Sequence, residues 1–260
     1  MTATAGESTP NLTDEALAQA VVDAARVLST EGLIEAFGHV SARSGATCFI
    51  ITPRQGLSSV QTDELLELEF DTDKPEGYML RTGGAAQVPI EAAIHAAIYR
   101  ARADVGAIVR DHGFASTVLA VAGIPLSPVH ALGAAVPGLV PVHDSPALIG
   151  QREAGASLAA LLGSGSAVLM RGNGRVVVGA SPAEACAKAL LLEESARVQL
   201  TARSAGASPR PLSEIETERA GHEVASRAQL LRVWEHMRRK HGLAVPQRAQ
   251  SRSSGRPVAG

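Results

Sequence analysis

One segment of the chain combines a carboxylate and an imidazole at a spacing that could serve acid–base or metal chemistry. Glu91 and His95 lie four residues apart in a stretch whose apolar positions predict a helix, so we expect both side chains on one face. His112 follows the next predicted strand, where α/β proteins place their active sites. These residues are candidates for proton transfer or for holding a cation. An exposed Glu–His pair and a capping histidine would show the same spacing.

A second group of polar residues lies in the segment 38–43, which we expect to form a turn between a helix and a strand. His39, Ser41 and Arg43 in such a turn could donate hydrogen bonds to a carboxylate or phosphate, although a solvated turn has the same composition. Asn173 is followed by glycine, a dipeptide typical of hairpin turns.

The remaining candidates have structural explanations. His130 and His143 follow strand-like segments and could face the same cleft, but we expect structural roles for them. Cys186 lies within a predicted helix and is expected to be an inert buried thiol. The glycine pairs match neither the phosphate-binding loop nor the dinucleotide fingerprint.

Strands alternate with helices along the chain, which predicts an α/β sandwich. The predicted strands are 48–52, 66–70, 106–110, 139–142, 167–170 and 176–178. The predicted helices run from a Thr13 cap to about residue 30, then over 89–102, 114–122, 146–162, 182–202 and 214–241, with a long loop over 72–87. We expect one domain over 13–242, a disordered start over 1–12 and a disordered basic tail over 243–260.

Composition excludes several classes of protein. The 260 residues are 45% hydrophobic and 19% charged, with a formal net charge of −2. Such an even charge argues against nucleic acid as a partner, and no apolar run reaches the roughly 18 residues of a membrane span. Two cysteines fit a reducing cytoplasm.

Six motifs in order resemble the class II aldolase/adducin family over about 70% of the chain. They are 38–43 (Gly-His-Val-Ser-Ala-Arg), 52–56 (Thr-Pro-Arg-Gln-Gly), 91–105, 108–112, 168–174 and 192–197. The first and third motifs are most similar to the decarboxylase-like branch. The resemblance implies a three-layer α/β/α sandwich with a mostly antiparallel central sheet. It also implies a homotetramer with active sites at subunit boundaries. The apolar residues of the last predicted helix need cover and are candidate contacts: Leu230, Leu231, Val233 and Trp234.

The resemblance also implies a divalent metal held by three histidines, with a nearby glutamate as acid or base. Glu91 and His112 match this pattern, but Arg110 and Asn173 stand where the other two histidines are expected. Arginine cannot ligate a metal, and asparagine offers only a weak oxygen donor. We therefore expect no cofactor; if zinc or manganese binds, Glu91 and His112 are the expected ligands.

Three functional hypotheses follow. In the first, Arg110 replaces the metal and holds a substrate carboxylate or enolate bidentately. Glu91, kept ionised by the helix dipole and by Arg110, moves a proton with His112, His39 or His95 as partners. The reaction would be a decarboxylation, a retro-aldol cleavage, or a related dehydration, isomerisation or cyclisation.

The residues expected to bind substrate are His39, Ser41, Arg43, Arg54, His95 and Asn173, and the arginines among them favour a small anionic substrate. The second hypothesis is a metal-dependent C–C lyase, an aldolase or decarboxylase, with a remodelled ligand set that draws on Glu91, His112 and also Asn173, His39 or His130. The third is a non-catalytic binding or scaffold protein of the adducin type.

Overall fold

A sheet of eight strands lies at the centre of the fold, in the order β4-β3-β2-β1-β5-β8-β7-β6. The computed structural model describes residues 12–244. The strands are β1 His39–Arg43, β2 Cys48–Ile51, β3 Leu66–Phe70, β4 Tyr78–Thr82, β5 Ala107–Asp111, β6 Val142–His143, β7 Ala167–Met170 and β8 Arg175–Gly179. Neighbouring strands run antiparallel, except for the parallel pair β6 and β7.

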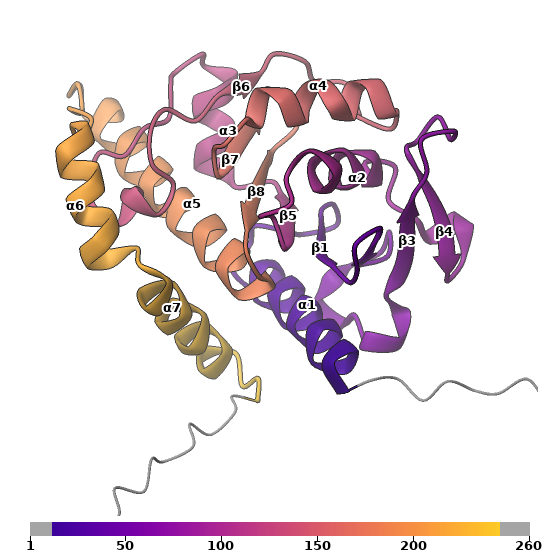
Figure 1. Cartoon of the computed structure of the whole chain (residues 1–260). Helices are drawn as coiled ribbons and strands as arrows, with labels where there is room; N and C mark the ends of the chain where they lie inside the picture. The colour runs from indigo at the N-terminus through magenta and orange to yellow at the C-terminus, as the bar shows by residue number, and fades with distance from the viewer. Residues whose placement is uncertain (1–11, 245–260) are drawn as a thin grey trace, which may run out of the picture.

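Helices cover both faces of this sheet (Figure 1). They are α1 Leu12–Thr30, α2 Ala92–Ala101, α3 Phe114–Val121, α4 Arg152–Leu162, α5 Pro182–Ser204, α6 Glu214–Val224 and α7 Arg227–Lys240. Helices α2 and α4 pack on one face, and α1, α3 and α5 pack on the other. The predicted three-layer sandwich with a mostly antiparallel sheet is therefore confirmed.

The central strand β5 shows why the sheet needs two helical layers. Successive side chains of a strand point to opposite faces; Ala107 and Val109 enter the core formed with α1, α3 and α5. Ile108 enters the core formed with α2 and α4. Because both faces of β5 are buried, its polar residues Arg110 and Asp111 must find partners inside the protein.

Two sequence-based expectations about strands were wrong. Residues 39–43 form the buried central strand β1 instead of a turn, because Gly38 with φ 132° turns the chain into the sheet. The expected loop over 72–87 contains β4, an edge strand paired with β3. Its side chains are mostly exposed, so the strand lacks the buried apolar pattern that would have revealed it.

Three other predicted elements have different bounds. The expected helix over 146–162 begins only at Arg152, and the residues before it have no regular secondary structure. The expected helix over 214–241 is two helices that meet at Ala225 and Ser226, where the chain leaves helical geometry. The strand expected over 139–142 is a short strand, β6, preceded by a single bridge between Val140 and Leu126.

The apolar residues of α7 are covered by their own chain. Leu230 and Trp234 are buried against other parts of the fold, whereas Leu231 remains 37% exposed. The argument that these residues need a partner subunit to cover them is therefore wrong for Leu230 and Trp234. The homotetramer stays a prediction that rests on the resemblance alone.

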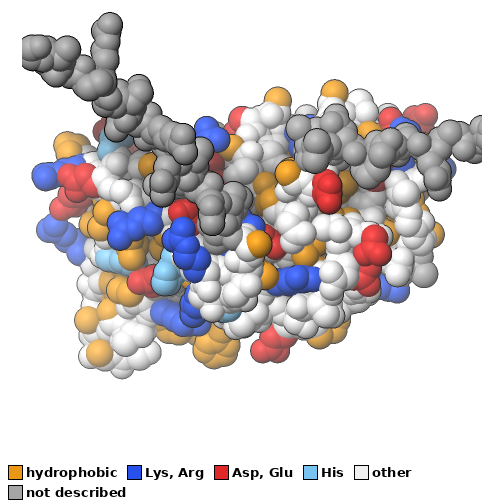
Figure 2. All heavy atoms as spheres, turned by 90° about the horizontal axis from the view of Figure 1, so that it is seen from below, with side chains coloured by type: hydrophobic (Ala, Val, Ile, Leu, Met, Phe, Trp, Pro, Cys, Tyr) orange, Lys and Arg blue, Asp and Glu red, His pale blue; other side chains and the backbone are white. Residues whose placement is uncertain are grey.

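Acidic and basic side chains are interspersed on the face shown in Figure 2, and basic ones gather over α7, whose last turn carries Arg238, Arg239 and Lys240. None of the described helices is long and apolar enough to cross a membrane. Disorder was expected over 1–12 and 243–260. Of these two segments, only residues 12, 243 and 244 are among the described residues.

Candidate active site

Arg110 lies at the centre of a buried polar cluster and is 1% exposed. Its Nη2 pairs with Glu91 Oε2 at 2.7 Å and donates to Asn173 Oδ1 at 2.8 Å. Its Nη1 donates to His112 Nε2 at 2.6 Å. The guanidinium thus contacts all three of the other residues that occupy metal-site positions in the resemblance.

Three parts of the fold bring this cluster together. Arg110 lies near the end of β5, opposite His39 of β1 in the sheet register, and His112 follows that strand directly. Asn173 lies in the tight turn between β7 and β8, as its Asn-Gly dipeptide predicts. Glu91 is the N-cap residue of α2, so it lies just outside the helix.

Glu91 uses both carboxylate oxygens. Besides Arg110, it accepts hydrogen bonds at Oε1 from Asn173 Nδ2 at 3.0 Å and from the Ile149 backbone amide at 3.2 Å. This last contact depends on the irregular segment before α4, which the sequence predicted to be helical. Glu91 and His95 do not act on one face as expected, because Glu91 reaches Arg110 while His95 reaches His39.

His112 is held as a neutral acceptor. Arginine is always a donor, so the bond from Arg110 places the His112 lone pair on Nε2 and its proton on Nδ1. Burial and the nearby charge of Arg110 lower the pKa of His112 to about 4. At neutral pH this imidazole is therefore uncharged.

The cluster forms one wall of a cavity of about 610 Å³. Six of the residues that sequence analysis selected line the cavity: Glu91, Arg110, His112, Asn173, His39 and Arg54. Phe37, Ile90 and Leu148 also line it and are exposed, giving the cavity an apolar rim. Sequence analysis missed these three: Ile90 and Leu148 fall in segments predicted to be helical, and Phe37 is an isolated apolar residue without a periodic signal.

Ser41, Arg43 and His95 do not line this cavity, so we no longer place them among the substrate-binding residues. Ser41 and His95 are buried beneath it. Arg43 turns away and donates to the carbonyl oxygens of Tyr99, Arg102 and Val105. Ser41 and Arg43 point toward α2 because alternate residues of a strand share one face, and His95 belongs to α2 itself.

The expected bidentate clamp by Arg110 also needs correction. Both terminal nitrogens of the guanidinium already bind Glu91, Asn173 and His112. A substrate therefore meets the positive charge of Arg110 without finding two free N–H groups on it.

The donor set does not fit the metal that the resemblance implies. The described residues contain no group of three or more His, Cys, Asp or Glu side chains placed to hold an ion. Glu91 and His112, the two remaining candidate ligands, both bond to a guanidinium whose charge repels a cation.

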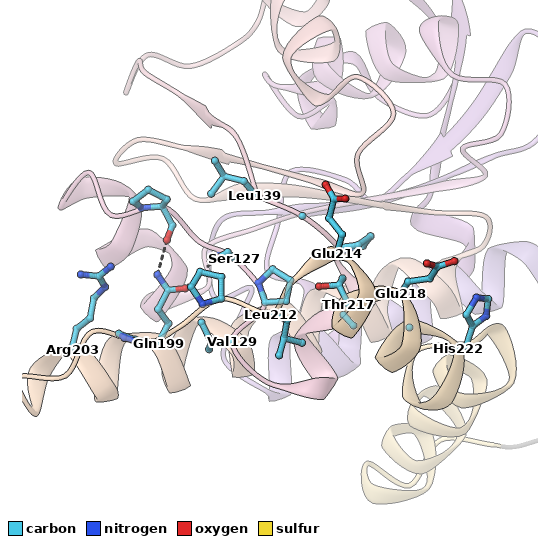
Figure 3. A pocket seen from close by; sticks show the side chains of 18 residues that line it. Ser127, Val129, Leu139, Gln199, Arg203, Leu212, Glu214, Thr217, Glu218 and His222 are labelled. Atoms are coloured by element: carbon cyan, nitrogen blue, oxygen red, sulfur yellow. Dashed lines mark hydrogen bonds between the residues drawn. The ribbon is translucent and has the colours of Figure 1, made fainter.

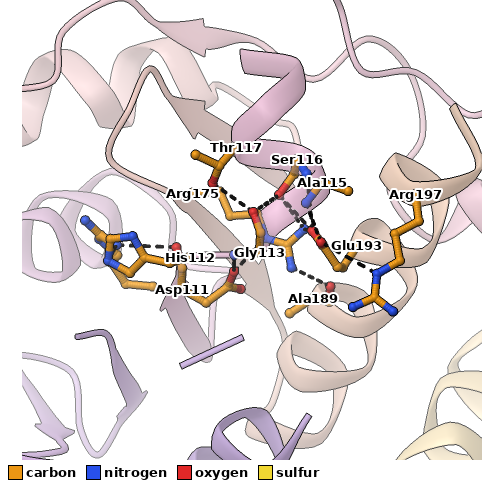
Figure 4. A network of polar contacts seen from close by, with 11 residues as sticks. Asp111, His112, Gly113, Ala115, Ser116, Thr117, Arg175, Ala189, Glu193 and Arg197 are labelled. Carbon is orange, nitrogen blue, oxygen red and sulfur yellow. Dashed lines mark hydrogen bonds and ion pairs between the residues drawn. The ribbon is translucent and has the colours of Figure 1, made fainter. Parts of the chain in front are cut away.

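A second buried network supports the turn that carries His112 (Figure 4). Arg175 pairs with Asp111 at 2.8 Å and with Glu193 at 3.2 Å. Glu193 also accepts the backbone amide of Ala115 at 2.7 Å and the Ser116 hydroxyl at 2.9 Å. A glutamate of α5 therefore caps the first turn of α3, immediately after His112.

A larger cavity, of about 940 Å³, lies between α6 and the end of α5 (Figure 3). Its walls are rich in proline and leucine. Its charged residues Arg203, Glu214 and Glu218 are exposed side chains. Its buried polar residues, Gln199 and Thr217, are uncharged, and Gln199 bonds to the backbone of Ser127 and Pro125. The smaller cavity has buried charged groups that converge on it and therefore remains the candidate for catalysis.

Comparisons with known proteins show the family to which the fold belongs. The family model described as "Class II Aldolase and Adducin N-terminal domain" matches residues 19–200. Curated relatives include 3,4-dihydroxyphthalate decarboxylases. The one from Arthrobacter keyseri is 27% identical over 223 residues, which are 81% of this chain and 88% of the relative. The one from Rhodococcus jostii is 29% identical over 208 residues, 76% and 85% of the two chains.

Solved structures show the same fold. An L-fuculose 1-phosphate aldolase from Glaciozyma antarctica has a TM-score of 0.74 at 22% identity, covering 91% of this chain and 95% of that one. An L-fuculose-1-phosphate aldolase from Thermus thermophilus has a TM-score of 0.63 at 28% identity, covering 75% and 98%. With the family match over residues 19–200, the chain belongs to the class II aldolase and adducin family.

Proposed function

We propose that this protein is a lyase that decarboxylates a hydroxylated aromatic carboxylate, with the charge of Arg110 in the place of the family's usual metal. The observation that carries the proposal is the contact of one buried guanidinium with Glu91, His112 and Asn173 on the wall of a cavity. The curated relatives named as 3,4-dihydroxyphthalate decarboxylases support the reaction class.

The cavity suits such a substrate in charge and in size. Arg54 and Arg110 line it together with a single acid, Glu91, so the lining favours an anion. Its volume of about 610 Å³ lies within the about 300–1,000 Å³ common for small-molecule sites. Phe37 and Leu148 offer apolar surface to an aromatic ring.

Decarboxylation breaks the bond between the ring carbon and the carboxyl carbon. CO₂ leaves, the electron pair stays on the ring, and a hydroxyl oxygen shares the negative charge. A buried cation beside that charge stabilises it in the transition state, and Arg110 supplies the cation without any movement. This role needs the charge of the guanidinium and no free N–H group.

Glu91 is the group that we assign to proton transfer. It would exchange one of its present donors for the substrate hydroxyl, take the hydroxyl proton and deliver it to the ring carbon that loses CO₂. The phenolate product then takes a proton from water, so the overall reaction consumes one proton. We assign the binding of substrate oxygens to His39 and His112, both of which line the cavity.

The test uses the full chain with 3,4-dihydroxyphthalate as the probe substrate. Release of CO₂ and of a dihydroxybenzoate is followed by chromatography, before and after dialysis against EDTA. We expect turnover that EDTA leaves unchanged. Turnover that depends on added zinc or manganese would instead support the metal-dependent lyase, and an absence of both turnover and binding would reject the proposed substrate class.

A pair of variants then tests the role of Glu91. Glu91→Gln should lower turnover by at least about 100-fold, the usual loss of a general acid or base. Glu153→Gln, on the exposed side of α4, is the matched control and should keep wild-type turnover. Both variants are compared at a temperature where circular dichroism shows them folded. Wild-type turnover in Glu91→Gln would move the proton-transfer role to another residue.

A further inference from the structure

A chain of four hydrogen-bonding side chains runs from the cavity wall into the protein. His39 Nδ1 lies 2.7 Å from His95 Nε2, and His95 Nδ1 lies 2.6 Å from Ser41 Oγ. Ser41 Oγ in turn lies 2.8 Å from the Tyr99 hydroxyl. All four side chains are buried, and only His39 lines the cavity.

The surroundings of this chain of side chains are buried and include an aromatic ring. Phe49 stacks on the ring of His95 with an interplanar angle of 7° and also packs against Tyr99. In such surroundings an unpaired hydroxyl proton is costly, at about 1–3 kcal/mol. The direction of the hydrogen bonds therefore follows from which protons can find acceptors.

At the inner end of this row of side chains, only one direction of hydrogen bonding gives every proton an acceptor. Among the described residues, Ser41 Oγ is the acceptor within reach of the Tyr99 hydroxyl. Tyr99 must donate to Ser41, so the single proton of Ser41 is left for His95 Nδ1. In the opposite direction the Tyr99 proton would have no acceptor.

At the outer end, the proton positions follow from the hydrogen bonds of the two imidazoles, His95 and His39. His95 accepts at Nδ1, and burial and the charge of Arg110 lower its pKa to about 3, so it is neutral and carries its proton on Nε2. That proton is donated to His39 Nδ1. Burial, His95 and Arg110 lower the pKa of His39 well below its usual value, so the single proton of His39 is on Nε2, the nitrogen turned away from His95.

We propose that Ser41, held by Tyr99, sets the tautomers of His95 and His39, so that His39 presents an N–H donor to the cavity. Ser41, His95 and Tyr99 are thus positioning residues that never touch the substrate. In the reaction proposed above, on which this role rests, His39 binds an anionic oxygen of the substrate as a neutral donor.

The same chain argues against net proton release by His39. If His39 lost its Nε2 proton, the replacement would have to come through His95 and Ser41 from Tyr99. That transfer would leave a buried tyrosinate, and burial raises the pKa of Tyr99 well above its ordinary range. His39 therefore stabilises charge while Glu91 moves the proton.

The test reads the tautomers directly, without any substrate. The full chain is labelled with ¹⁵N-histidine, and two-bond ¹H–¹⁵N correlation spectra are recorded at neutral pH. Signals are assigned with His39→Gln and His95→Gln, or by elimination with Gln variants of the six other histidines. We expect both rings to show a protonated Nε2 and an unprotonated Nδ1. A protonated Nδ1 on His39 would overturn the proposal whether or not the protein is a decarboxylase.

One variant and its control test whether Ser41 sets the direction of these hydrogen bonds. Ser41→Ala removes the donor to His95 Nδ1, so the signals of His95 and His39 should split or broaden as both tautomers become populated. Tyr78→Phe removes the other tyrosine hydroxyl of the chain, which lies on the edge strand β4, and should leave both signals unchanged. Unchanged tautomers in folded Ser41→Ala would show that Ser41 does not set them. If Ser41→Ala fails to fold, Ser41→Cys, a weaker donor, replaces it and should shift the same signals.

Discussion

The buried pair of Glu91 and Arg110 makes a sharp prediction about stability. Glu91 accepts from three donors with two oxygens, at 2.7 Å from Arg110, 3.0 Å from Asn173 and 3.2 Å from Ile149. Glutamine has one carbonyl oxygen, so in Glu91→Gln an amide NH₂ group faces either Arg110 or the other two donors. The guanidinium also loses its counter-charge while it stays buried.

Breaking one partner of a buried ion pair costs about 3–5 kcal/mol. We expect the free energy of unfolding of Glu91→Gln and of Arg110→Met to fall by this amount. The double variant should be at least about 2 kcal/mol more stable than the sum of the single losses predicts, because it leaves no unpaired charge. Glu153→Gln, which removes an exposed pair with Arg152 of the same 2.7 Å length, should cost at most about 1 kcal/mol.

The assay is equilibrium unfolding in urea, followed by the fluorescence of Trp234, the one tryptophan of the chain. Trp234 is buried in the fold, so its emission reports loss of packing, and far-ultraviolet circular dichroism provides a second probe. Protein concentration is kept fixed, because association would shift the midpoint. Additive single losses, or a Glu91→Gln variant within about 0.5 kcal/mol of wild type, would refute the coupled pair; this size of change is typical of neutral surface substitutions.

Three further predictions concern other parts of the site. Glu193→Gln should lower the free energy of unfolding by about 1–3 kcal/mol and speed amide exchange in the first turn of α3; wild-type exchange there would contradict its capping role. Arg110→His combined with Asn173→His should place three imidazoles together with His112 and bind about one zinc per chain in calorimetry, and heats no larger than those of wild type would show that the geometry is unsuitable. In the unfolded chain His95 takes up a proton below about pH 6.5, whereas burial keeps its pKa in the folded protein at about 3. The free energy of unfolding should therefore fall by about 1.4 kcal/mol for each pH unit below about 6.5 through this group. His95→Gln should have a shallower slope between about pH 6.5 and 4, and an equal slope would mean that His95 does not contribute.

The local pattern of the chain was sufficient for much of the architecture. Strands β3 and β7 were predicted with their observed bounds, because alternation or a short apolar run between turn residues is a local property. The turn with Asn173 and the N-terminus of α5 at Pro182 were also predicted locally. The strand β4 was missed because only Tyr78 and Leu80 of this edge strand are partly buried, and two such positions leave too short a pattern.

The composition of the candidate site could also be proposed from the sequence, since Glu91, Arg110, His112 and Asn173 follow the order of the family motifs. Their contacts could not. Glu91 and Asn173 lie 82 residues apart, and only the pairing of β5 with β8 and the packing of α2 on the sheet bring them together.

The tertiary structure also decided what the polar residues do. The sequence placed His39, Ser41 and Arg43 in a turn that could bind an anion, and the structure makes them part of a central strand. Alternation in that strand sends Ser41 inward to His95 and Tyr99. The sequence by itself determined which hydrogen-bonding groups and charges the protein must satisfy. Which of them meet was decided by strand register and layer packing, because a buried charge or hydroxyl takes whichever partner the fold brings within about 3 Å.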